Sequence, residues 1–315
     1  ALCLAIEELA RADSSVAITL EAAVGLGSMP IFRFGTEEQK QCWLPALCSG
    51  QRLGAFALTE PGGGSDAGAT RTTARCDDDD WVINGSKAFI TNSGTDITSV
   101  VTVTAITGVS GGRKEISTIM VPAHHPGFTI SANYSKVGWK CSDTRALFFD
   151  DCRVPVSNLL GARGRGYAQS LSILDEGRIA IAAVGVGLAQ GCIDECVSYA
   201  RQRRAFGHAI GSYQAIQFKI ADMEARTHTA RLAYYHAAAR MLRGEPFKKE
   251  AAIAKLVSSN AAMDNARDAT QVFGGYGFMN EYPVARFYRD AKVLEIGEGT
   301  SEIQRLLIAR HLGLT

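Results

Sequence analysis

The stretch Ile179-Ala-Ile-Ala-Ala-Val-Gly-Val-Gly-Leu-Ala189 carries no polar side chain on any side of a helix. A helix without a polar face has to be buried on several sides, so this stretch predicts the central member of a helix bundle. The helical pattern around it extends from Tyr167 to Arg203. Further helical patterns, joined by the short connections typical of a bundle, follow at residues 212–243, 247–273, 281–289 and 301–312.

Residues 52–165, before the long helix, change to short runs that alternate or are rich in β-branched residues. Turn residues separate these runs, and this spacing predicts a small barrel or sandwich. The acidic run 77–80 is interpreted as the solvated turn of a hairpin, Asn84-Gly85 as a tight turn, and residues 108–113 as a mobile hairpin tip. The predicted strands cover residues 53–58, 72–76, 81–83, 86–91, 98–104, 116–121, 128–131 and 145–149.

Residues 1–51 are helical again. The first pattern predicts one helix over residues 1–25, ended by Gly25 and Gly27. Thr36-Glu-Glu-Gln39 has the spacing of a capping box, which predicts a second helix that runs to about Leu47. The expected fold class is therefore α+β and multidomain. A helical domain occupies residues 1–51, a β-domain residues 52–165 and a helical bundle residues 166–315.

Composition argues against several function classes. The 315 residues contain 33 Lys and Arg against 32 Asp and Glu, a net charge of +1, so no charge imbalance indicates nucleic acid or a membrane surface as a partner. No uninterrupted apolar run reaches about 18 residues, and no membrane span is predicted. The apolar start, residues 1–6, lacks the basic region of a signal peptide and continues through residues 7–11 as an amphipathic helical pattern. The missing initiator Met is consistent with a start inside a longer protein. Eight scattered cysteines form no CxxC set, which indicates reduced thiols in a cytosolic-type compartment.

Glu298 lies in the turn Gly297-Glu298-Gly299, directly before the last predicted helix. Glycines on both sides let a ligand come close to the carboxylate, and a mobile acid on such a turn suits a general base. An acid at this place also suits a helix N-terminus without any catalytic role. Ser301 and Gln304 have the spacing of a capping box. An apolar stripe follows, made of Ile303, Leu306 and Leu307.

Five other motifs each have a functional and a structural interpretation. Thr59-Glu-Pro-Gly-Gly-Gly-Ser-Asp66 either exposes backbone N–H groups to a ligand or only joins two strands. Phe89-Ile-Thr91 places a ring and a hydroxyl on one face, either for a flat cofactor or for the core. The charges of Asp175-Glu-Gly-Arg178 either pair with each other or face a ligand. Arg201-Gln-Arg-Arg-Ala-Phe-Gly207 suits a phosphate or a helix C-terminus, and Gln271-Val-Phe-Gly-Gly-Tyr-Gly277 is typical of a helix end with a tight turn.

Taken together and in this order, these motifs resemble the acyl-CoA dehydrogenase family. The resemblance rests on Thr59 to Asp66, Arg203-x-x-Phe206-Gly207, Gln271-x-Phe273-Gly274-Gly275-x-Gly277 and Glu298-Gly-Thr-Ser301, with Tyr288-Arg-Asp290 before the last. It covers essentially the whole chain, and the C-terminal half is most similar to the short-chain type. The resemblance implies a helical domain, a middle β-domain and a C-terminal four-helix bundle, usually in a homotetramer, with FAD between the β-domain and the bundle. Family members have additional helices before the position of Ala1, so the chain resembles a member that lacks its first helices.

The resemblance also implies a role for each motif. Glu298 would be the base that removes the pro-R α-proton of an acyl-CoA thioester while the β-hydride passes to flavin N5. Its backbone N–H and a ribityl hydroxyl of FAD would stabilise the enolate oxygen. The acyl-CoA would be contacted by Ser65, Asp175, Arg178 and Gly299, with Arg178 as the anchor of the CoA moiety. The flavin would be lined by Phe56, Leu58, Thr59, Gly64, Ser65, Phe89, Ile90 and Thr91; its phosphates or adenine would be met by Arg203, Arg204, Ala205, Phe206, Tyr213 and Gln214; Gln271, Phe273, Gly274 and Gly275 would reach it from a neighbouring subunit; and Thr300 to Glu302 would cap it.

Three positions bear on this assignment. Some members place the base at the position of Gly177, and a glycine there leaves Glu298 as the base. Phe89 and Gly297 stand where many members have Trp and Tyr, and Gly297 is expected to widen the pocket beside the base, which leaves acyl chain length and branching open.

The leading hypothesis is dehydrogenation with electrons handed to an electron-transfer flavoprotein. The alternatives are an acyl-CoA oxidase that uses oxygen and a flavin- or acyl-CoA-binding protein without turnover. The expected location is the bacterial cytoplasm, or the mitochondrial matrix in a eukaryote.

Overall fold

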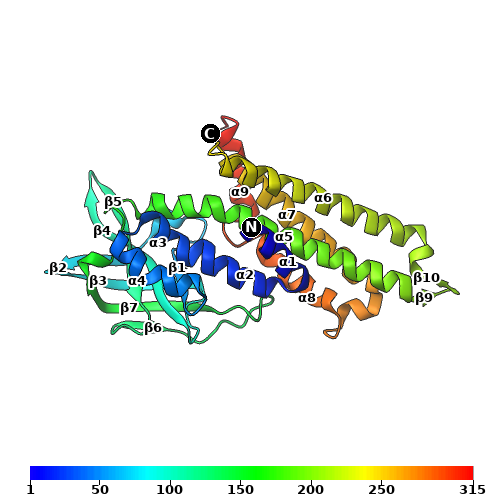
Figure 1. The fold of residues 1–315 in the computed structure, drawn as a ribbon, viewed down its shortest axis with the longest axis horizontal. Coiled ribbons are helices and arrows are strands. Elements are labelled where there is room, and N and C mark those ends of the chain that lie inside the picture. Colours follow the sequence, from blue (N-terminus) through cyan, green and yellow to red (C-terminus); the bar gives the residue numbers. More distant parts are fainter. Residues whose placement is uncertain (315) are drawn as a thin grey trace. The chain divides into compact units, whose positions relative to one another are not determined.

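The computed structural model of the protein describes residues 1–314, and these residues form two compact units (Figure 1). We call them the helical unit, made of residues 1–18, 136–141 and 175 onward, and the β unit, made of residues 19–135 and 142–174. Helices, strands and helices again follow one another along the chain, as predicted. The unit boundaries cut the long helix between Leu174 and Asp175.

The β unit contains one connected eight-stranded sheet, in the order β6-β7-β3-β2-β4-β5-β8, with β1 paired to β4 in parallel. Side chains from strands near both ends of this order meet in one core, among them Phe128, Ile83, Val103 and Ile119. The sheet therefore curves around that core, as expected of a small barrel or sandwich. Its strands are β1 (Leu53–Ala57), β2 (Thr73–Asp77), β3 (Asp80–Thr91), β4 (Thr98–Ser110), β5 (Arg113–Pro122), β6 (Phe128–Ile130), β7 (Thr144–Pro155) and β8 (Leu159–Leu160).

The predicted hairpins are confirmed, but the tight turn at Asn84-Gly85 is wrong. Strand β3 continues through both residues, with a bulge opposite β7 between Ile83 and Gly85. Gly85 has a φ of 147°, and a Cβ there would lie 2.6–2.8 Å from atoms of Thr72. The glycine is needed because Thr72, directly before β2, passes closely, and no chain reversal occurs at Gly85.

The N-terminal region consists of several short helices. These are α1 (Leu2–Ala12), α2 (Ser14–Glu21), a π-helix (Ala22–Ser28), α3 (Met29–Phe34) and α4 (Glu37–Cys48). The capping box of α4 is confirmed, because Thr36 accepts from the Gln39 N–H and the Gln39 side chain accepts from the Thr36 N–H.

The predicted single helix over residues 1–25 is wrong. The break lies at Asp13, which has an extended backbone. Its carboxylate accepts hydrogen bonds from the N–H groups of Ser15 and Val16, at the start of the next helix. Gly25 and Gly27 do not end a helix. A Cβ on Gly27 would lie 2.5 Å from the Gly54 carbonyl oxygen, so this glycine lets the helical backbone approach β1.

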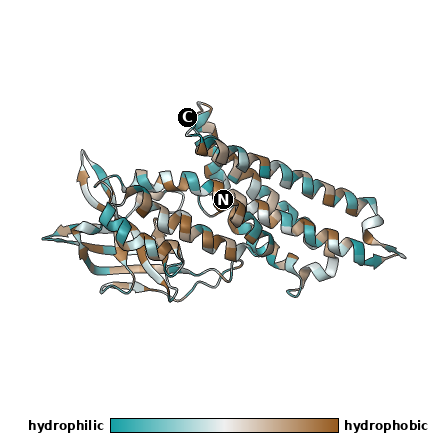
Figure 2. Ribbon diagram, in the orientation of Figure 1, coloured by the Kyte–Doolittle hydropathy of each residue, from teal (hydrophilic) through white to brown (hydrophobic). Residues whose placement is uncertain are grey.

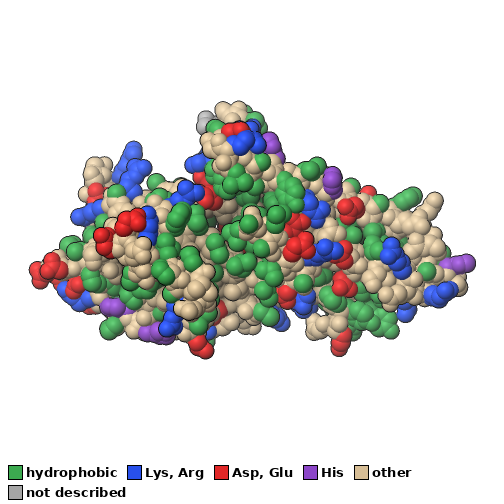
Figure 3. All heavy atoms as spheres, viewed as in Figure 1, with side chains coloured by type: hydrophobic (Ala, Val, Ile, Leu, Met, Phe, Trp, Pro, Cys, Tyr) green, Lys and Arg blue, Asp and Glu red, His purple; other side chains and the backbone are tan. Residues whose placement is uncertain are grey.

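The helical unit is built around α7 (Lys248–Phe273), which packs along α6 (Gln214–Leu242) and contacts α8 (Pro283–Leu294) and α9 (Ser301–His311). Asn265 of α7 donates to the Ala189 carbonyl of α5 (Gly166–Gln202), so α5 also lies in the bundle. As predicted, α5 is buried from Ile179 to Ala189. Helix α6 carries hydrophilic and hydrophobic residues along its length, as an outer helix does (Figure 2). Acidic and basic side chains are intermixed on the face in Figure 3.

Two segments, Ser14–Phe34 and Gly166–Gln202, are long and apolar enough to cross a membrane by length and composition alone. In the second, 83% of the most apolar window is buried inside the protein, as expected of a core helix. Both segments contain polar residues, so neither is an uninterrupted apolar run, and they pass this test by their mean hydropathy over a window. The absence of a membrane span stays a prediction.

Candidate active site

The turn between α8 and α9 holds Glu298. Helix α9 begins at Ser301, so the residue that caps its N-terminus is Thr300 and not Ser301. Thr300 has a non-helical backbone, and its hydroxyl accepts from the Ile303 N–H at 3.3 Å. The capping box predicted from Ser301 and Gln304 is therefore wrong, because Ser301 is already the first helical residue. Gln304 instead donates from Nε2 to the Gly299 carbonyl oxygen at 2.8 Å.

The inward face of α9 is polar. Ser301 and Gln304 are its buried residues, while Leu306 is 44% exposed. The predicted apolar stripe of α9 is thus not the buried face, because the helix turns Gln304 toward the carbonyl groups of the turn. This orientation ties α9 to the turn that carries Glu298.

Glu298 itself adopts a left-handed backbone, with a φ of 52°, and Gly299 follows with a φ of 91°. A side chain in this region costs about 1–2 kcal/mol, and such strain clusters at functional sites. Glu298 is half-buried. The acid is therefore held by the surrounding structure, and its conformation differs from the one that an ordinary helix-terminal acid adopts.

Lys255 of α7 lies beneath this turn and is fully buried. Its Nζ donates to the Gly299 carbonyl oxygen at 2.8 Å. Burial lowers the pKa of Lys255 to about 8, although the nearby Glu298 opposes the change, so the amine is protonated at pH 7. Lys255 is not among the site residues predicted from the sequence. The sequence pattern that could have indicated a buried lysine is its spacing of four residues from both Ala251 and Ser259, on a helix face of small buried side chains.

Asp175 and Arg178 form the i,i+3 pair that was the structural interpretation of this motif. Both side chains are buried, and Lys248 of α7 also reaches Asp175, at 2.8 Å. The Nε of Arg178 is buried and has no hydrogen-bond partner among residues 1–314. This Nε–H is therefore an unsatisfied buried donor, and Lys248 adds a cation whose side chain is 59% exposed.

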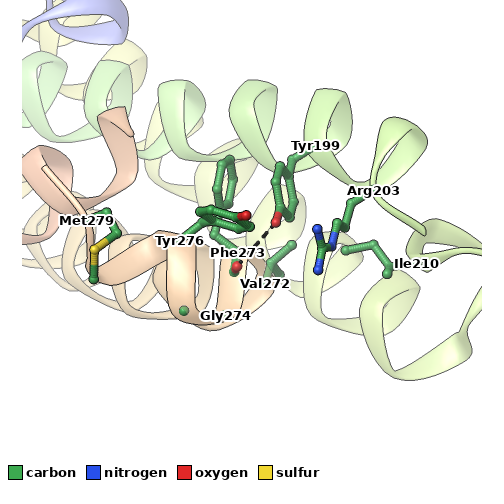
Figure 4. Close-up of a pocket in the computed structure, with 9 residues that line it drawn as sticks. Tyr199, Arg203, Ile210, Val272, Phe273, Gly274, Tyr276 and Met279 are labelled. Atoms are coloured by element: carbon green, nitrogen blue, oxygen red, sulfur yellow. Dashed lines mark hydrogen bonds between the residues drawn. The ribbon is translucent and has the colours of Figure 1, made fainter. Parts of the chain in front are cut away.

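A pocket of about 520 Å³ lies at the other end of the bundle (Figure 4). The Tyr199 and Phe273 rings stack with centroids 4.0 Å apart, and the Arg203 guanidinium lies 5.5 Å from the centre of the Tyr276 ring. A Cβ on Gly274 or Gly275 would meet no atom within 4 Å, so their backbone stays open to the pocket. Flat rings, an arginine and bare backbone suit a heteroaromatic ring and a phosphate.

Arg203, Phe273, Gly274 and Gly275 therefore line one pocket within a single chain. From the sequence, Arg203 and the glycine motif were expected to reach a cofactor from different subunits. The remaining residues of these two sets lie outside the pocket. Phe206 is 95% exposed on the hairpin of β9 (Arg204–Ala205) and β10 (His208–Ala209). The Tyr213 hydroxyl donates to the Ala205 carbonyl oxygen at 2.9 Å. Gln214 and Gln271 are exposed.

In the β unit, Phe89 is an unusual aromatic residue. It is 65% exposed, has a φ of 61° and lies 5.4 Å from the Tyr134 ring. A core role for Phe89 is therefore wrong, whereas Ile90 is buried in the core and Thr91 is half-buried. Of the other predicted flavin-lining residues, Leu58 is buried, Phe56 and Thr59 are half-buried, and Gly64 and Ser65 are exposed.

A buried ion pair holds the loop that contains Gly64 and Ser65. The Lys87 Nζ lies 2.9 Å from the Glu60 carboxylate, which also accepts from the N–H groups of Arg71 at 2.8 Å and Thr72 at 3.0 Å. Burial lowers the pKa of Lys87 to about 8. The pKa of Glu60 is lowered too, because its bonds to Lys87 and Thr72 outweigh the opposing effect of burial. This pair is not among the features predicted from the sequence. The pattern that could have indicated it is a lysine within an otherwise inward-facing strand segment.

Models of three domains match the chain. They are the acyl-CoA dehydrogenase N-terminal domain at residues 1–51, the middle domain at 55–152 and the C-terminal domain at 164–313. The mouse mitochondrial short-chain specific acyl-CoA dehydrogenase is 46% identical over 312 residues, which are 99% of this chain and 75% of the relative.

Two solved structures have the same fold. The butyryl-CoA dehydrogenase of Megasphaera elsdenii has a TM-score of 0.94 at 44% identity, over 98% of this chain and 81% of the other. An acyl-CoA dehydrogenase of Bacillus anthracis complexed with FAD has a TM-score of 0.92 at 36% identity, over 98% of this chain and 56% of the other.

Proposed function

The chain belongs to the acyl-CoA dehydrogenase family, and from this premise we propose that it uses FAD to convert a short- to medium-chain acyl-CoA, straight or branched, into the trans-2-enoyl-CoA. The enzyme class, an oxidoreductase that dehydrogenates acyl-CoA, follows from family membership over the whole chain. The observation that carries the proposed mechanism is the strained, glycine-bracketed turn of Glu298.

The residues present fit FAD. In the helical unit, the pocket of Arg203, Phe273, Gly274 and Gly275 would take its adenine or phosphates. Thr300 and Glu302, next to the Glu298 turn and away from this pocket, would cap the cofactor, as the resemblance to the family implies. In the β unit, the exposed Phe89 ring offers a stacking surface, and the loop of Gly64 and Ser65 offers backbone donors. When bound, FAD would supply the acceptor for the β-hydrogen and its electron pair.

The chain's own part in the reaction is proton removal. The Glu298 carboxylate would take the α-proton, and the electron pair of that C–H bond would move into the thioester, where charge develops on the oxygen. A backbone N–H of the turn would donate to this oxygen, and one donor of this kind contributes roughly 3–4 kcal/mol in other enzymes. Ordering of the turn before the substrate binds lowers the cost of reaching this geometry.

Substrate binding would use the helical unit. Arg178 and Asp175, with Lys248 beside them, would meet the CoA moiety, Ser65 of the β unit would touch the thioester region, and Gly299 would border the acyl group. A Cβ on Gly297 would meet no atom closer than 3.4 Å, so there is room beside the base. The relatives named for short-chain acyl-CoA and butyryl-CoA support a short acyl chain, and the room at Gly297 supports branching as well.

The partners are also proposed. An electron-transfer flavoprotein would reoxidise the enzyme, and the protein would work as a homotetramer in the bacterial cytoplasm, or in the mitochondrial matrix in a eukaryote. The resemblance of the ordered motifs to the family is what supports these assignments.

The test is a spectrophotometric screen of the FAD-loaded protein with acyl-CoA thioesters of increasing length and branching, without oxygen. We expect bleaching of the flavin absorbance, fastest with short chains. If the protein is saturated with FAD and no thioester bleaches the flavin, the proposal is overturned in favour of a binding protein without turnover. Stoichiometric hydrogen peroxide in air, with no rate gain from an external acceptor, would indicate an oxidase.

A further inference from the structure

The buried lysine beneath the Glu298 turn has a role beyond packing, and this inference rests on the proposed function. We propose that Lys255 is a positioning residue for the base. Its ammonium group holds the backbone immediately after Glu298 and keeps the Glu298 carboxylate ionised before proton transfer.

The backbone part of the role follows from the contacts. Two donors from two helices converge on the Gly299 carbonyl oxygen, Lys255 Nζ of α7 and Gln304 Nε2 of α9, each at 2.8 Å. Gln304 also reaches the Glu298 carbonyl oxygen at 3.4 Å. A left-handed backbone at a residue other than glycine, as at Glu298, persists only where the surroundings hold it. Lys255 and Gln304 supply that hold.

The charge part follows from what faces the amine. Glu298 and Glu295 from the turn and Glu302 from α9 favour the ammonium form of Lys255, and Arg178 from α5 opposes it. Among these groups, Glu298 has the largest effect. Interactions between charges are reciprocal, so the ammonium favours the ionised form of Glu298. Lys292 partly neutralises Glu295, at 2.6 Å, which leaves Glu298 as the main counter-charge.

Lys87 and Lys255 differ in what holds their ammonium groups. Both lysines are fully buried, but Lys87 touches the carboxylate of Glu60 at 2.9 Å. Within the described part of the chain, the hydrogen bond of Lys255 goes to a backbone carbonyl. A buried charge is costly unless it is paired. A structural ion pair in direct contact accounts for Lys87, and the neighbouring base accounts for Lys255.

The experiment measures proton transfer alone, with FAD-loaded protein and acetyl-CoA in D2O. Acetyl-CoA has α-protons but no β-carbon, so it can be enolised and not dehydrogenated. The α-proton passes to Glu298, the C–H electron pair enters the enolate, and a deuteron from the exchanged carboxyl group returns to the same carbon. The exchange rate, followed by NMR against pH, falls on the acidic side as Glu298 becomes protonated.

Lys255→Met removes both the charge and the hydrogen bond, and Lys255→Gln removes the charge while it keeps a donor. We expect both to move the midpoint of the acidic limb upward by about one pH unit. Gln304→Met is the matched control, because it removes the neutral donor to the same oxygen. It should slow exchange but leave the midpoint in place.

An unchanged midpoint in the Lys255 variants, or an equal shift in Gln304→Met, would overturn the inference. Glu298→Gln separates this failure from that of the proposed function. If Glu298→Gln still exchanges at the wild-type rate, the proposed base is wrong. If it loses exchange while the Lys255 variants keep the wild-type midpoint, only the role of Lys255 is wrong.

Discussion

The two glycines that flank Glu298 have different roles, and a pair of alanine substitutions separates them. At Gly299, where φ is 91°, a Cβ would lie 2.8 Å from Gln304 Nε2 and 3.4 Å from Ile303 Cγ2. A side chain in the left-handed region costs about 1–2 kcal/mol. Displacement of Gln304 from the Gly299 carbonyl loses a hydrogen bond worth about 1 kcal/mol. We therefore expect Gly299→Ala to lower the free energy of unfolding by about 2–3 kcal/mol.

Gly297→Ala is the control on the other side of the same acid. Its Cβ would meet the Val293 carbonyl oxygen at 3.4 Å and Val293 Cγ2 at 4.0 Å, which are ordinary contacts, and Gly297 does not have a positive φ. The expected change is within about 0.5 kcal/mol. Thermal unfolding of both variants, monitored by circular dichroism, measures the difference. For a unit of this size, Gly299→Ala should lower Tm by roughly 5–10 °C.

Activity gives the second readout. Gly299→Ala should slow flavin bleaching by butyryl-CoA because the Glu298 backbone shifts, whereas Gly297→Ala should bleach at a rate near that of the wild type. Equal losses of stability and rate at the two positions would refute the claim that the turn is held through Gly299.

Three further predictions concern other parts of the molecule. Thr36→Ala removes the capping box of α4 and should cost about 1 kcal/mol in chemical denaturation, whereas Thr36→Ser should cost much less. The pKa of Lys87 falls from 10.5 to about 8 on folding, because burial disfavours the protonated amine. Folding therefore carries no such cost above pH 10.5, where the amine is neutral in both states, and carries the full cost once the pH has fallen through 8. The free energy of unfolding of the wild type relative to Lys87→Met should therefore rise by about 3 kcal/mol between pH 8 and pH 10.5 in urea titrations, and a flat difference would contradict this assignment. Arg203→Ala should weaken FAD binding at least about tenfold in fluorescence titration, the value of one charge-assisted contact, and unchanged affinity would remove Arg203 from the cofactor site.

Local patterns predicted much of this fold. The capping box of Thr36 and Gln39 and the apolar stretch of α5 depend on residues close together in sequence, and both are confirmed. Asn84-Gly85 was misinterpreted because the need for glycine comes from Thr72, which lies directly before the neighbouring strand β2. The local pattern is the same for a turn and for a close approach of two strands.

The candidate site was predictable only in part. Glu298 stands out because glycines flank it in the sequence. Lys255 lies far from it along the chain, and it meets Gly299 only after α7 and α9 have packed together. Lys87 likewise finds Glu60 only across the sheet. A single sequence identifies such lysines by their apolar surroundings, but their partners depend on tertiary structure.

The central claim is that Glu298 removes the α-proton. Glu298→Gln keeps the size of the side chain and removes the basic carboxylate, so FAD should still bind. Rapid mixing of FAD-loaded protein with butyryl-CoA, without oxygen, measures the first-order rate of flavin bleaching. A rate lowered by about 100-fold to 10,000-fold, with normal flavin content, is the predicted result. Bleaching at the wild-type rate would contradict the claim.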